Sequence, residues 1–245
     1  MHNAAFAALG LDWRYAKLPV PAALFAETVR ALPGSGYRGA NVTIPHKLAA
    51  LEVADRATGA ARGVGAANTL TFSAEGAIEA DNTDAQGFLE ALGESPRGRR
   101  ALVLGAGGAG RAVAWALRRE GAAEVLIWNR TPGRAEDLAR ELELDAVRSP
   151  RSAEIVVNAT SVGLDAVSLA EAVRTLALES LDAPAVVVDL VYAARPTPVL
   201  AWGERVGARV VGGLEVLVRQ GALSFERWTG QAPPLDVMRA AARGG

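Results

Sequence analysis

Cysteine is absent from this 245-residue chain, and histidine occurs only as His2 and His46. The absence of cysteine excludes disulfides, thiolate metal sites and a thiol nucleophile, and two histidines are too few for a histidine-rich metal site. The sequence also lacks an apolar run as long as a membrane span, and its N-terminus does not have the pattern of a signal peptide. We therefore expect a cytoplasmic protein with no metal site and no membrane partner.

An excess of charge of one sign is lacking as well. The 26 basic and 27 acidic side chains give a formal net charge of −1. This balance provides no global basic field for nucleic acid, so we expect no nucleic-acid partner. Half of the residues are hydrophobic, which is sufficient for the core of one large domain or two modest ones.

Lysine is scarce, because only Lys17 and Lys47 among the 26 basic residues are lysines. Arginine stays protonated at usable pH, whereas the pKa of lysine responds to burial and neighbouring charges. If drift has replaced most lysines by arginine, a surviving lysine is favoured where its chemistry is needed. Lys47 follows a predicted strand and Pro45, so we expect it in the first turns of a helix that faces a cleft. Lys17 has no motif around it, so composition alone leaves the role of Lys47 open.

The order of hydrophobic patterns predicts an α/β fold. The first third predicts helices over 2–10 and 21–32, strands over 12–20 and 37–43, and a hairpin over 68–82. A helix over 83–94 and a βαβ unit over 100–131 follow. The apolar strands predicted at 154–160 and 183–192 fit a parallel sheet covered on both faces. The remaining predictions are a helix over 197–207, a strand over 208–213, and helices over 212–230 and 235–245.

A glycine motif lies between the strand and the helix of the βαβ unit. Gly105, Gly107 and Gly110 form G-x-G-x-x-G. The first glycine permits a tight turn, the second lets the backbone approach a pyrophosphate, and the third allows close packing of helix and strand. The helix N-terminus adds N–H groups and a positive dipole. We therefore predict a dinucleotide-binding turn made of Gly105, Ala106, Gly107, Gly108, Ala109 and Gly110.

The residues after the next strand indicate which dinucleotide binds. An NAD enzyme typically has Asp or Glu there, to bind the ribose hydroxyls. This chain has Asn129, Arg130 and Thr131 instead. Arg130 can form a charge-assisted fork with a 2′-phosphate, and Arg134 can join it from one turn onward. The predicted cofactor is NADP.

Asparagine is scarce, and most of it lies at the ends of predicted strands: Asn3, Asn41, Asn68, Asn82, Asn129 and Asn158. Open α/β folds bind ligands at such positions. Asp84 adds a carboxylate where the first region of the chain meets the second. A purely structural alternative is that Asp84 caps the N-terminus of the following helix, and this role is compatible with a catalytic one.

Eight ordered segments resemble the shikimate dehydrogenase family over essentially the whole chain: GANVTIPHK, GAANTL, DNTDAQGF, GAGGAGRA, WNRT, VNATSVG, DLVY with TPVL, and GLEVLVRQGALSFERWTG. The resemblance implies an α/β enzyme that reversibly oxidises shikimate to 3-dehydroshikimate with NADP, in aromatic amino-acid biosynthesis. It implies a Rossmann-type dinucleotide-binding domain over 84–212 and a smaller α/β substrate-binding domain over 1–83, to which 213–245 returns. We expect a monomer or a homodimer.

The same resemblance implies roles for individual residues. Lys47 and Asp84 would form the catalytic pair that exchanges a proton with the reacting hydroxyl. Groups that would bind the substrate are Asn41, Thr43, Asn68 and Gln220, with Tyr192 near both substrate and nicotinamide. Groups that would bind the cofactor are Asn129, Arg130 and Thr131 at the adenosine phosphate, with Gly213 near the nicotinamide.

The chain departs from the family pattern at two places. Val216 stands where methionine is usual, a volume change that we expect to be tolerated. The family also has a strand and a Ser-x-Ser-Pro segment upstream of the pair that is His2-Asn3 here, and those serines bind the substrate carboxylate. We expect that the start has been assigned too far downstream, since the rest of the site is intact. The alternative is a shortened protein with an incomplete site.

Other functions remain open at this stage. A quinate/shikimate dehydrogenase is a close alternative, although NAD-using members would carry an acidic residue near Asn129. A methylene-tetrahydrofolate dehydrogenase shares the architecture but does not explain NVTIPHK and DNTD. A non-catalytic NADP-binding protein is the alternative if the N-terminal loss is genuine.

Overall fold

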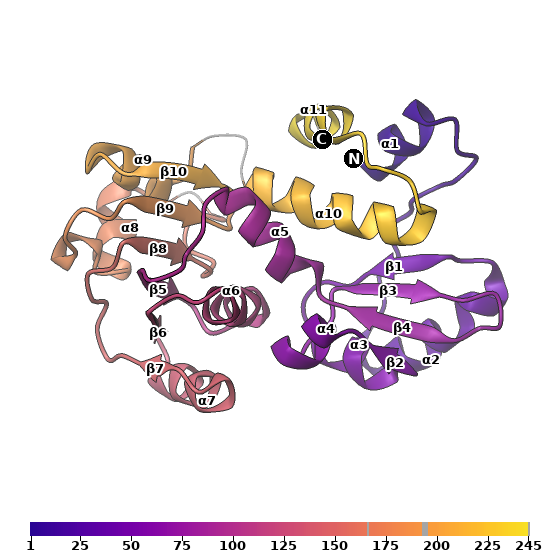
Figure 1. Ribbon diagram of the computed structural model, residues 1–245, viewed down its shortest axis with the longest axis horizontal. Coiled ribbons are helices and arrows are strands. Elements are labelled where there is room, and N and C mark those ends of the chain that lie inside the picture. Colours follow the sequence, from indigo (N-terminus) through magenta and orange to yellow (C-terminus); the bar gives the residue numbers. More distant parts are fainter. Residues whose placement is uncertain (166, 193–195, 245) are drawn as a thin grey trace. The chain divides into compact units, whose positions relative to one another are not determined.

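The computed structural model describes residues 1–165, 167–192 and 196–244, and the chain divides into two compact units (Figure 1). Unit 1 comprises Met1–Gly87 and Val218–Gly245, and unit 2 comprises Phe88–Leu217. Both divisions fall inside a helix, α5 (Thr83–Leu92) and α10 (Gly213–Thr229). The boundaries predicted from the sequence lie at the starts of the same two helices.

Unit 2 contains a parallel sheet with the strand order β10-β9-β8-β5-β6-β7 in the described residues. The strands are β5 (Arg100–Leu104), β6 (Glu124–Trp128), β7 (Asp145–Ala146), β8 (Ile155–Asn158), β9 (Val186–Asp189) and β10 (Arg209–Gly212). The helices are α6 (Gly108–Arg119), α7 (Pro132–Leu142), α8 (Leu169–Thr175), the short η3 (Leu178–Ser180) and α9 (Pro198–Arg205). The predicted α/β class with a Rossmann-type sheet is confirmed.

Helices cover both faces of this sheet, with α6 and α7 on one face and α8 and α9 on the other (Figure 1). Leu102 and Leu104 of β5 are fully buried and share a core cluster with Val187 of β9 and Trp202 of α9. Continuous apolar strands are expected where neither face of a parallel sheet meets water. The ends of these strands are therefore the part of the sheet that can present polar groups to a ligand.

Unit 1 contains a four-stranded sheet with the order β1-β3-β4-β2. The strands are β1 (Gly39–Asn41), β2 (Arg56–Ala57), β3 (Thr69–Phe72) and β4 (Ile78–Asp81). The helices are α1 (His2–Ala8), η1 (Ala22–Leu24), α2 (Phe25–Ala31), η2 (Pro33–Ser35), α3 (Lys47–Val53), α4 (Gly59–Val64) and α11 (Leu235–Arg243). β3 and β4 form the predicted hairpin, with Gly76 at φ +88° in its turn. The terminal helix was predicted to reach residue 245, which lies outside the described residues.

Helices α2, α3 and α4 lie on one face of this sheet, and α10 lies on the other (Figure 1). Trp228 of α10 fixes the helix to the sheet, because its Nε1 donates a hydrogen bond to the carbonyl of Leu70 at 3.0 Å. A Cβ atom at Gly39 would lie 2.1 Å from the same Nε1. Glycine at this position of β1 therefore leaves the space that the indole fills.

The strand predicted over 12–20 is wrong. This segment is extended, but it pairs with no strand in the part of the chain that the structure describes. A side chain bonds its backbone instead: Asn3 Oδ1 accepts from the Tyr15 N–H at 2.6 Å, and Asn3 Nδ2 donates to the Tyr15 carbonyl at 3.0 Å. The alternating Leu11, Trp13 and Tyr15 pack against the cluster around α1 and α11. Every second side chain of this segment is apolar because it packs against helices, and not because the segment is a strand of the sheet.

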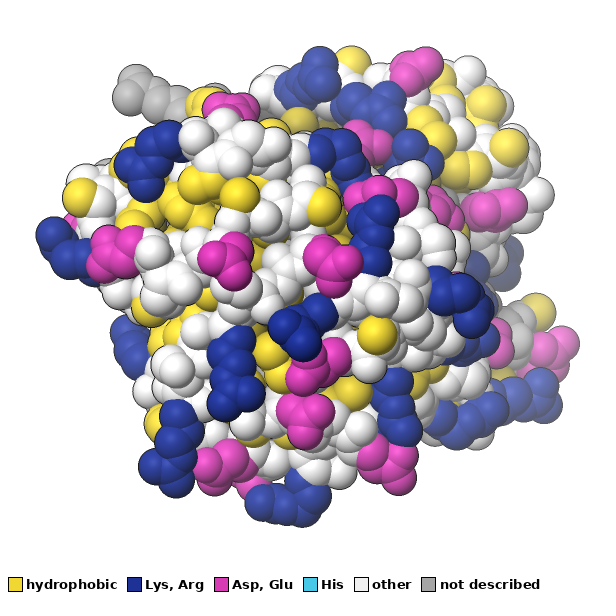
Figure 2. All heavy atoms as spheres, turned by 60° about the vertical axis from the view of Figure 1, so that its left-hand side comes forward, with side chains coloured by type: hydrophobic (Ala, Val, Ile, Leu, Met, Phe, Trp, Pro, Cys, Tyr) yellow, Lys and Arg dark blue, Asp and Glu magenta, His cyan; other side chains and the backbone are white. Residues whose placement is uncertain are grey.

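Within the described residues, no helix combines the length and the apolar character needed to cross a membrane. On the face that Figure 2 shows, basic and acidic side chains are interspersed.

Candidate functional site

Lys47 and Asp84 form an ion pair in unit 1. Lys47 is the first residue of α3, Asp84 lies in the first turn of α5, and Nζ is 2.6 Å from Oδ2. The side chains are only 15% and 21% exposed, so water screens the pair incompletely. The residue before Lys47 is also held, because the His46 ring stacks on Phe25 with centroids 4.6 Å apart. The start of α3 thus directs Lys47 at the carboxylate.

Asp84 is not the N-cap of α5, so a helix-capping role does not explain why a carboxylate stands at this position. The capping side chain is Asn82, whose Oδ1 accepts a hydrogen bond from the Ala85 N–H at 3.2 Å. The carboxylate of Asp84 accepts from Asn68 Nδ2 on Oδ1 at 2.8 Å and from Lys47 on Oδ2. A separate donor on each oxygen fixes the plane of the carboxylate beside the lysine.

Asn68 is buried, and its amide is held at both ends. Its Oδ1 accepts the Thr83 N–H at 2.7 Å. Its Nδ2 lies 3.0 Å from Thr83 Oγ1 and 3.3 Å from Gln220 Oε1, besides donating to Asp84. These contacts link the residue before β3 to α5 and α10, so Asn68 joins the ion pair to the rest of unit 1.

Asn41, at the end of β1, is held in the same way. Its Nδ2 donates to Ser224 Oγ at 2.8 Å and lies 3.2 Å from Thr69 Oγ1. Its Oδ1 accepts from the hydroxyl of Tyr15 at 3.2 Å. The sequence analysis assigned no role to Ser224, Thr69 or Tyr15, although Thr69 and Ser224 lie inside segments that carry the family resemblance.

The predicted substrate-binding residues divide between the two units. Asn41, Thr43, Asn68 and Gln220 belong to unit 1 with Lys47 and Asp84. Thr43 lies in the segment before α3 and is exposed. Tyr192 belongs to unit 2, follows β9 and is 56% exposed.

The glycine turn of unit 2 has one open and two closed positions. Gly105 has φ +111°, and a Cβ atom there would lie 2.7 Å from the carbonyl oxygen of Ala159. A Cβ atom at Gly110 would lie 2.0 Å from the carbonyl oxygen of Gly105. At Gly107, which precedes α6, a Cβ atom would meet nothing within 4 Å. The closed positions serve packing, and the open one leaves room for a ligand at the helix N-terminus.

Asn129 connects this turn to the loop after β6. Its Oδ1 accepts from the Ala106 N–H at 3.2 Å, and its Nδ2 donates to the Thr131 carbonyl at 3.0 Å. Arg130 and Arg134 are exposed and beside the start of α7. Gly213, at the start of α10, has no room for a side chain, because a Cβ atom would lie 2.6 Å from the Leu190 carbonyl oxygen.

Arg148 is an arginine that the sequence analysis missed. β7 runs parallel to β6 with Ile127 opposite Ala146, and the Val147 N–H donates to the Ile127 carbonyl at 2.9 Å. Exposed Arg148 follows directly, so it leaves the sheet at the same edge as Arg130. The two-residue β7 was too short to recognise from its pattern.

Two buried groups have shifted pKa values. Burial and the nearby positive charge of the N-terminus lower the pKa of His2 to about 4, and a contact with Asn41 offsets part of this shift. Burial raises the pKa of Asp189, although hydrogen bonds from Thr197, Val191 and Asn158 oppose the shift. His2 is neutral at physiological pH, and its ring stacks on Tyr15 with centroids 4.5 Å apart.

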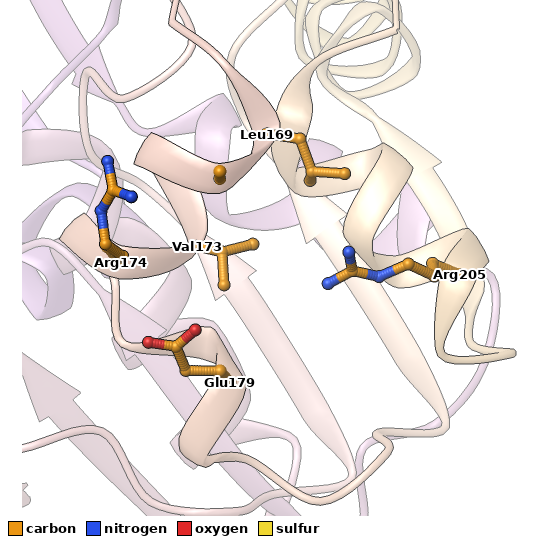
Figure 3. A pocket seen from close by; sticks show the side chains of 6 residues that line it. Leu169, Val173, Arg174, Glu179 and Arg205 are labelled. Atoms are coloured by element: carbon orange, nitrogen blue, oxygen red, sulfur yellow. The ribbon is translucent and has the colours of Figure 1, made fainter.

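No metal-binding cluster occurs in the described residues, and a pocket in unit 2 does not account for the predicted chemistry. No group of three His, Asp or Glu side chains suited to a metal occurs in the described ranges. A pocket of about 440 Å³ lies beside α8, η3 and α9 (Figure 3). Its apolar floor includes Val173, and Arg174, Glu179 and Arg205 surround it. Arg174 and Arg205 lie in the last turns of α8 and α9, which precede the amino ends of β9 and β10. The glycine turn follows the carboxyl end of β5, so this pocket is not the dinucleotide site.

Three family models match the chain. The substrate binding domain of shikimate dehydrogenase matches residues 1–70, and the shikimate/quinate 5-dehydrogenase model matches residues 89–197. The C-terminal domain of shikimate 5′-dehydrogenase matches residues 213–243. These matches extend over both units.

Individual relatives are similar to this chain over nearly its full length. An NADP-dependent shikimate dehydrogenase from Methanopyrus kandleri is 43% identical, over 98% of this chain and 88% of the relative. The crystal structure of shikimate 5-dehydrogenase from Thermus thermophilus with NADP(H) and shikimate is 40% identical, with a TM-score of 0.87 over 99% of this chain and 92% of that chain. A 5-ketofructose reductase from a Gluconobacter species is 32% identical, with a TM-score of 0.86 over 99% of this chain and 91% of that chain.

Proposed function

This chain belongs to the shikimate dehydrogenase family, and we propose that it is an NADP-dependent oxidoreductase that interconverts shikimate and 3-dehydroshikimate, in the route to the aromatic amino acids. The observation that carries the proposal is the half-buried ion pair of Lys47 and Asp84 at 2.6 Å. Oxidation of an alcohol requires a hydride acceptor and a group that accepts the hydroxyl proton. The lysine of this ion pair provides the second of these, and it can return the proton in the reverse reaction.

Lys47 exchanges the proton. In the reductive direction its ammonium donates a proton to the carbonyl oxygen of the substrate, which becomes a hydroxyl. In the oxidative direction the amine accepts the proton of that hydroxyl. Asp84 keeps the lysine beside the reacting oxygen and stabilises its charged form, since Asn68 holds the other carboxylate oxygen at 2.8 Å.

Polar groups of unit 1 orient the substrate. We assign hydrogen bonds with its hydroxyls to Asn41, Thr43, Asn68 and Gln220. The amides of Asn41 and Asn68 already have several protein partners, so they are positioned before substrate binds. Preorganised polar groups lower the cost of fixing the substrate for reaction.

Unit 2 fits NADP by two features of its own residues. The open space at Gly107 beside the N-terminus of α6 suits a pyrophosphate. Arg130, Arg134 and Arg148 provide positive charge for a 2′-phosphate at the edge where β6 and β7 end, and Asn129 and Thr131 shape that loop. NADP supplies the hydride acceptor of the oxidation. We assign Tyr192 and Gly213 to the nicotinamide end.

The remaining parts of the proposal concern organisation. We assign substrate binding to the domain formed by 1–83 and 213–245, and cofactor binding to 84–212. The enzyme acts on a small molecule, without a nucleic-acid or membrane partner. It works as a monomer or a homodimer in the cytoplasm.

Turnover measurements test the proposal. Purified protein should form NADPH from NADP and shikimate at alkaline pH. Parallel reactions with quinate, and with 5-ketofructose and NADPH, test the other substrate classes. Faster turnover of quinate or 5-ketofructose would reassign the substrate, and NADP binding without any turnover would favour the non-catalytic alternative.

A further inference from the structure

We propose that Ser224 is a positioning residue that fixes the orientation of the Asn41 amide, so that Asn41 offers a hydrogen-bond acceptor to the substrate. The identity of the substrate rests on the proposed function, whereas the orientation of the amide does not. Ser224 lies on α10 and is 0% exposed. Its hydroxyl therefore cannot exchange partners with water.

Ser224 Oγ is surrounded by four polar atoms. It lies 3.1 Å from the Gln220 carbonyl oxygen, one turn earlier in α10, and 2.8 Å from Asn41 Nδ2. The hydroxyl oxygens of Thr69 and Thr83 lie at 2.9 and 3.4 Å. A hydroxyl has one proton and two acceptor sites, so the number of partners constrains its direction.

The proton of Ser224 goes to the Gln220 carbonyl, which can only accept. The two acceptor sites of Ser224 are then filled by Asn41 Nδ2 and the Thr69 hydroxyl. In turn, Thr69 Oγ1 can accept from Thr83 Oγ1 at 3.1 Å, and Thr83 Oγ1 accepts from Asn68 Nδ2 at 3.0 Å. This order gives every buried hydroxyl a donor and an acceptor, as buried polar groups require.

A second acceptor excludes the flipped amide. The carbonyl oxygen of Asn68 lies 3.4 Å from Asn41 Nδ2, and a carbonyl cannot donate. If the amide of Asn41 were flipped, its oxygen would face the oxygens of Asn68 and Ser224. The NH₂ group of Asn41 must therefore face Ser224 and the Asn68 carbonyl, and its Oδ1 faces the Tyr15 hydroxyl.

Oδ1 of Asn41 is the acceptor for which a ligand would compete, and the His2 ring also contacts the Asn41 side chain. Oδ1 accepts from the Tyr15 hydroxyl at 3.2 Å, which is longer than the usual O–H···O distance of about 2.8 Å. A substrate hydroxyl can share or replace this weak bond. Ser224, which needs no contact with the substrate, thus decides that Asn41 accepts a hydrogen bond instead of donating one.

Kinetics of Ser224→Ala test this role. We expect KM for shikimate to rise about 5- to 10-fold, the scale of one lost hydrogen bond of about 1 kcal/mol. The kcat value should change less than about 2-fold, and KM for NADP should not change, because Lys47 and the glycine turn are untouched. Ser168→Ala in unit 2 is the matched control, since it removes a serine hydroxyl that accepts a hydrogen bond from the Glu171 N–H at the N-cap of α8.

A double-mutant cycle separates positioning from stability. If Ser224 acts through Asn41, Ser224→Ala should have no further effect on KM in the Asn41→Ala background. A purely structural serine would lower Tm and raise KM additively in both backgrounds. Additive effects, or an unchanged KM in the single variant, would overturn the proposal.

Side-chain NMR of the wild-type protein tests the orientation without any turnover or variant. The NH₂ protons of Asn41 should exchange slowly with solvent and show cross-peaks to Ser224. Fast exchange, or cross-peaks to Tyr15 in place of Ser224, would reject the orientation. If the protein fails to oxidise shikimate but shows the slow exchange, the proposed function fails and the orientation stands.

Discussion

Nζ of Lys47 lies 2.6 Å from Oδ2 of Asp84, while the other oxygen of Asp84 is held by Asn68 at 2.8 Å. The lysine therefore faces a carboxylate that cannot turn away without breaking a second hydrogen bond. Most of the positive charge of this protein is arginine, so the amine of Lys47 is chemically unusual as well as well positioned.

Lys47→Arg should lower kcat for shikimate oxidation about 10²-fold or more, the scale of lost acid–base catalysis. The variant keeps the charge opposite Asp84 but loses the group that can release a proton. NADP affinity, measured by fluorescence titration, should change little. Lys17→Arg is the matched control because Lys17 is exposed, and wild-type turnover by Lys47→Arg would remove Lys47 from the mechanism.

Gly107→Ala should weaken NADP binding about 10-fold while leaving Tm nearly unchanged. The added methyl group meets no atom of the protein within 4 Å, but it occupies the space that a pyrophosphate needs. Gly59→Ala in α4 of unit 1 is the control, since its Cβ atom also meets nothing within 4 Å. In contrast, Gly110→Ala should lower Tm, because its Cβ atom would lie 2.0 Å from the Gly105 carbonyl oxygen.

Arg130→Asp should weaken NADP binding and reduce the preference for NADP over NAD, because a carboxylate repels the 2′-phosphate. Arg148→Ala should have a smaller effect in the same direction, with NAD binding unchanged. Calorimetric titration with both cofactors measures the preference. Arg140→Ala is the control, since Arg140 is paired with Asp137 on the surface of α7. An unchanged preference in Arg130→Asp would show that the phosphate binds elsewhere.

Stability should fall as the pH is lowered from about 6.5 to 4 in a way that depends on His2. Its pKa is about 4 in the folded protein and ordinarily 6.5. Between these pH values the unfolded chain takes up a proton at His2 that the folded protein does not. The contribution of His2 to the free energy of unfolding is therefore complete only above the ordinary pKa. The loss attributable to His2 should reach about 3 kcal/mol at pH 4.

Urea unfolding of the wild type and His2→Phe at several pH values measures this contribution. Phenylalanine preserves a ring for stacking on Tyr15 but has no proton to take up. The difference between the two proteins should change by about 3 kcal/mol across the window. Parallel curves for the two proteins would show that His2 is not the group responsible.

The sequence predicted the features that depend on short-range spacing. The spacing of Gly105, Gly107 and Gly110 already implies two positions for packing and one for a ligand, because a turn between strand and helix has little freedom. Lys47 stood out because lysine is rare in this chain. The hairpin of β3 and β4 was predictable from its alternation and from Gly76.

The features that the sequence did not predict depend on contacts between distant residues. Ser224 meets Asn41 across 183 positions of the chain, and an isolated serine in a helix gives no signal of such a contact. The wrong strand over 12–20 has a similar origin. Alternation shows that every second residue is covered, but it does not show whether a sheet or a layer of helices covers it.

The discontinuity of unit 1 has a consequence for protein synthesis. On the ribosome, residues 88–217 of unit 2 are complete before Ser224 and Trp228 have been made. Domains generally fold as units during translation, so unit 2 can fold early, while β1 and β3 wait for α10. Until α10 has been made, the space beside Gly39 is not filled by the indole of Trp228, and Ser224 does not orient the amide of Asn41. Unit 1, which carries Lys47, is therefore completed after unit 2, when α10 and α11 have been translated.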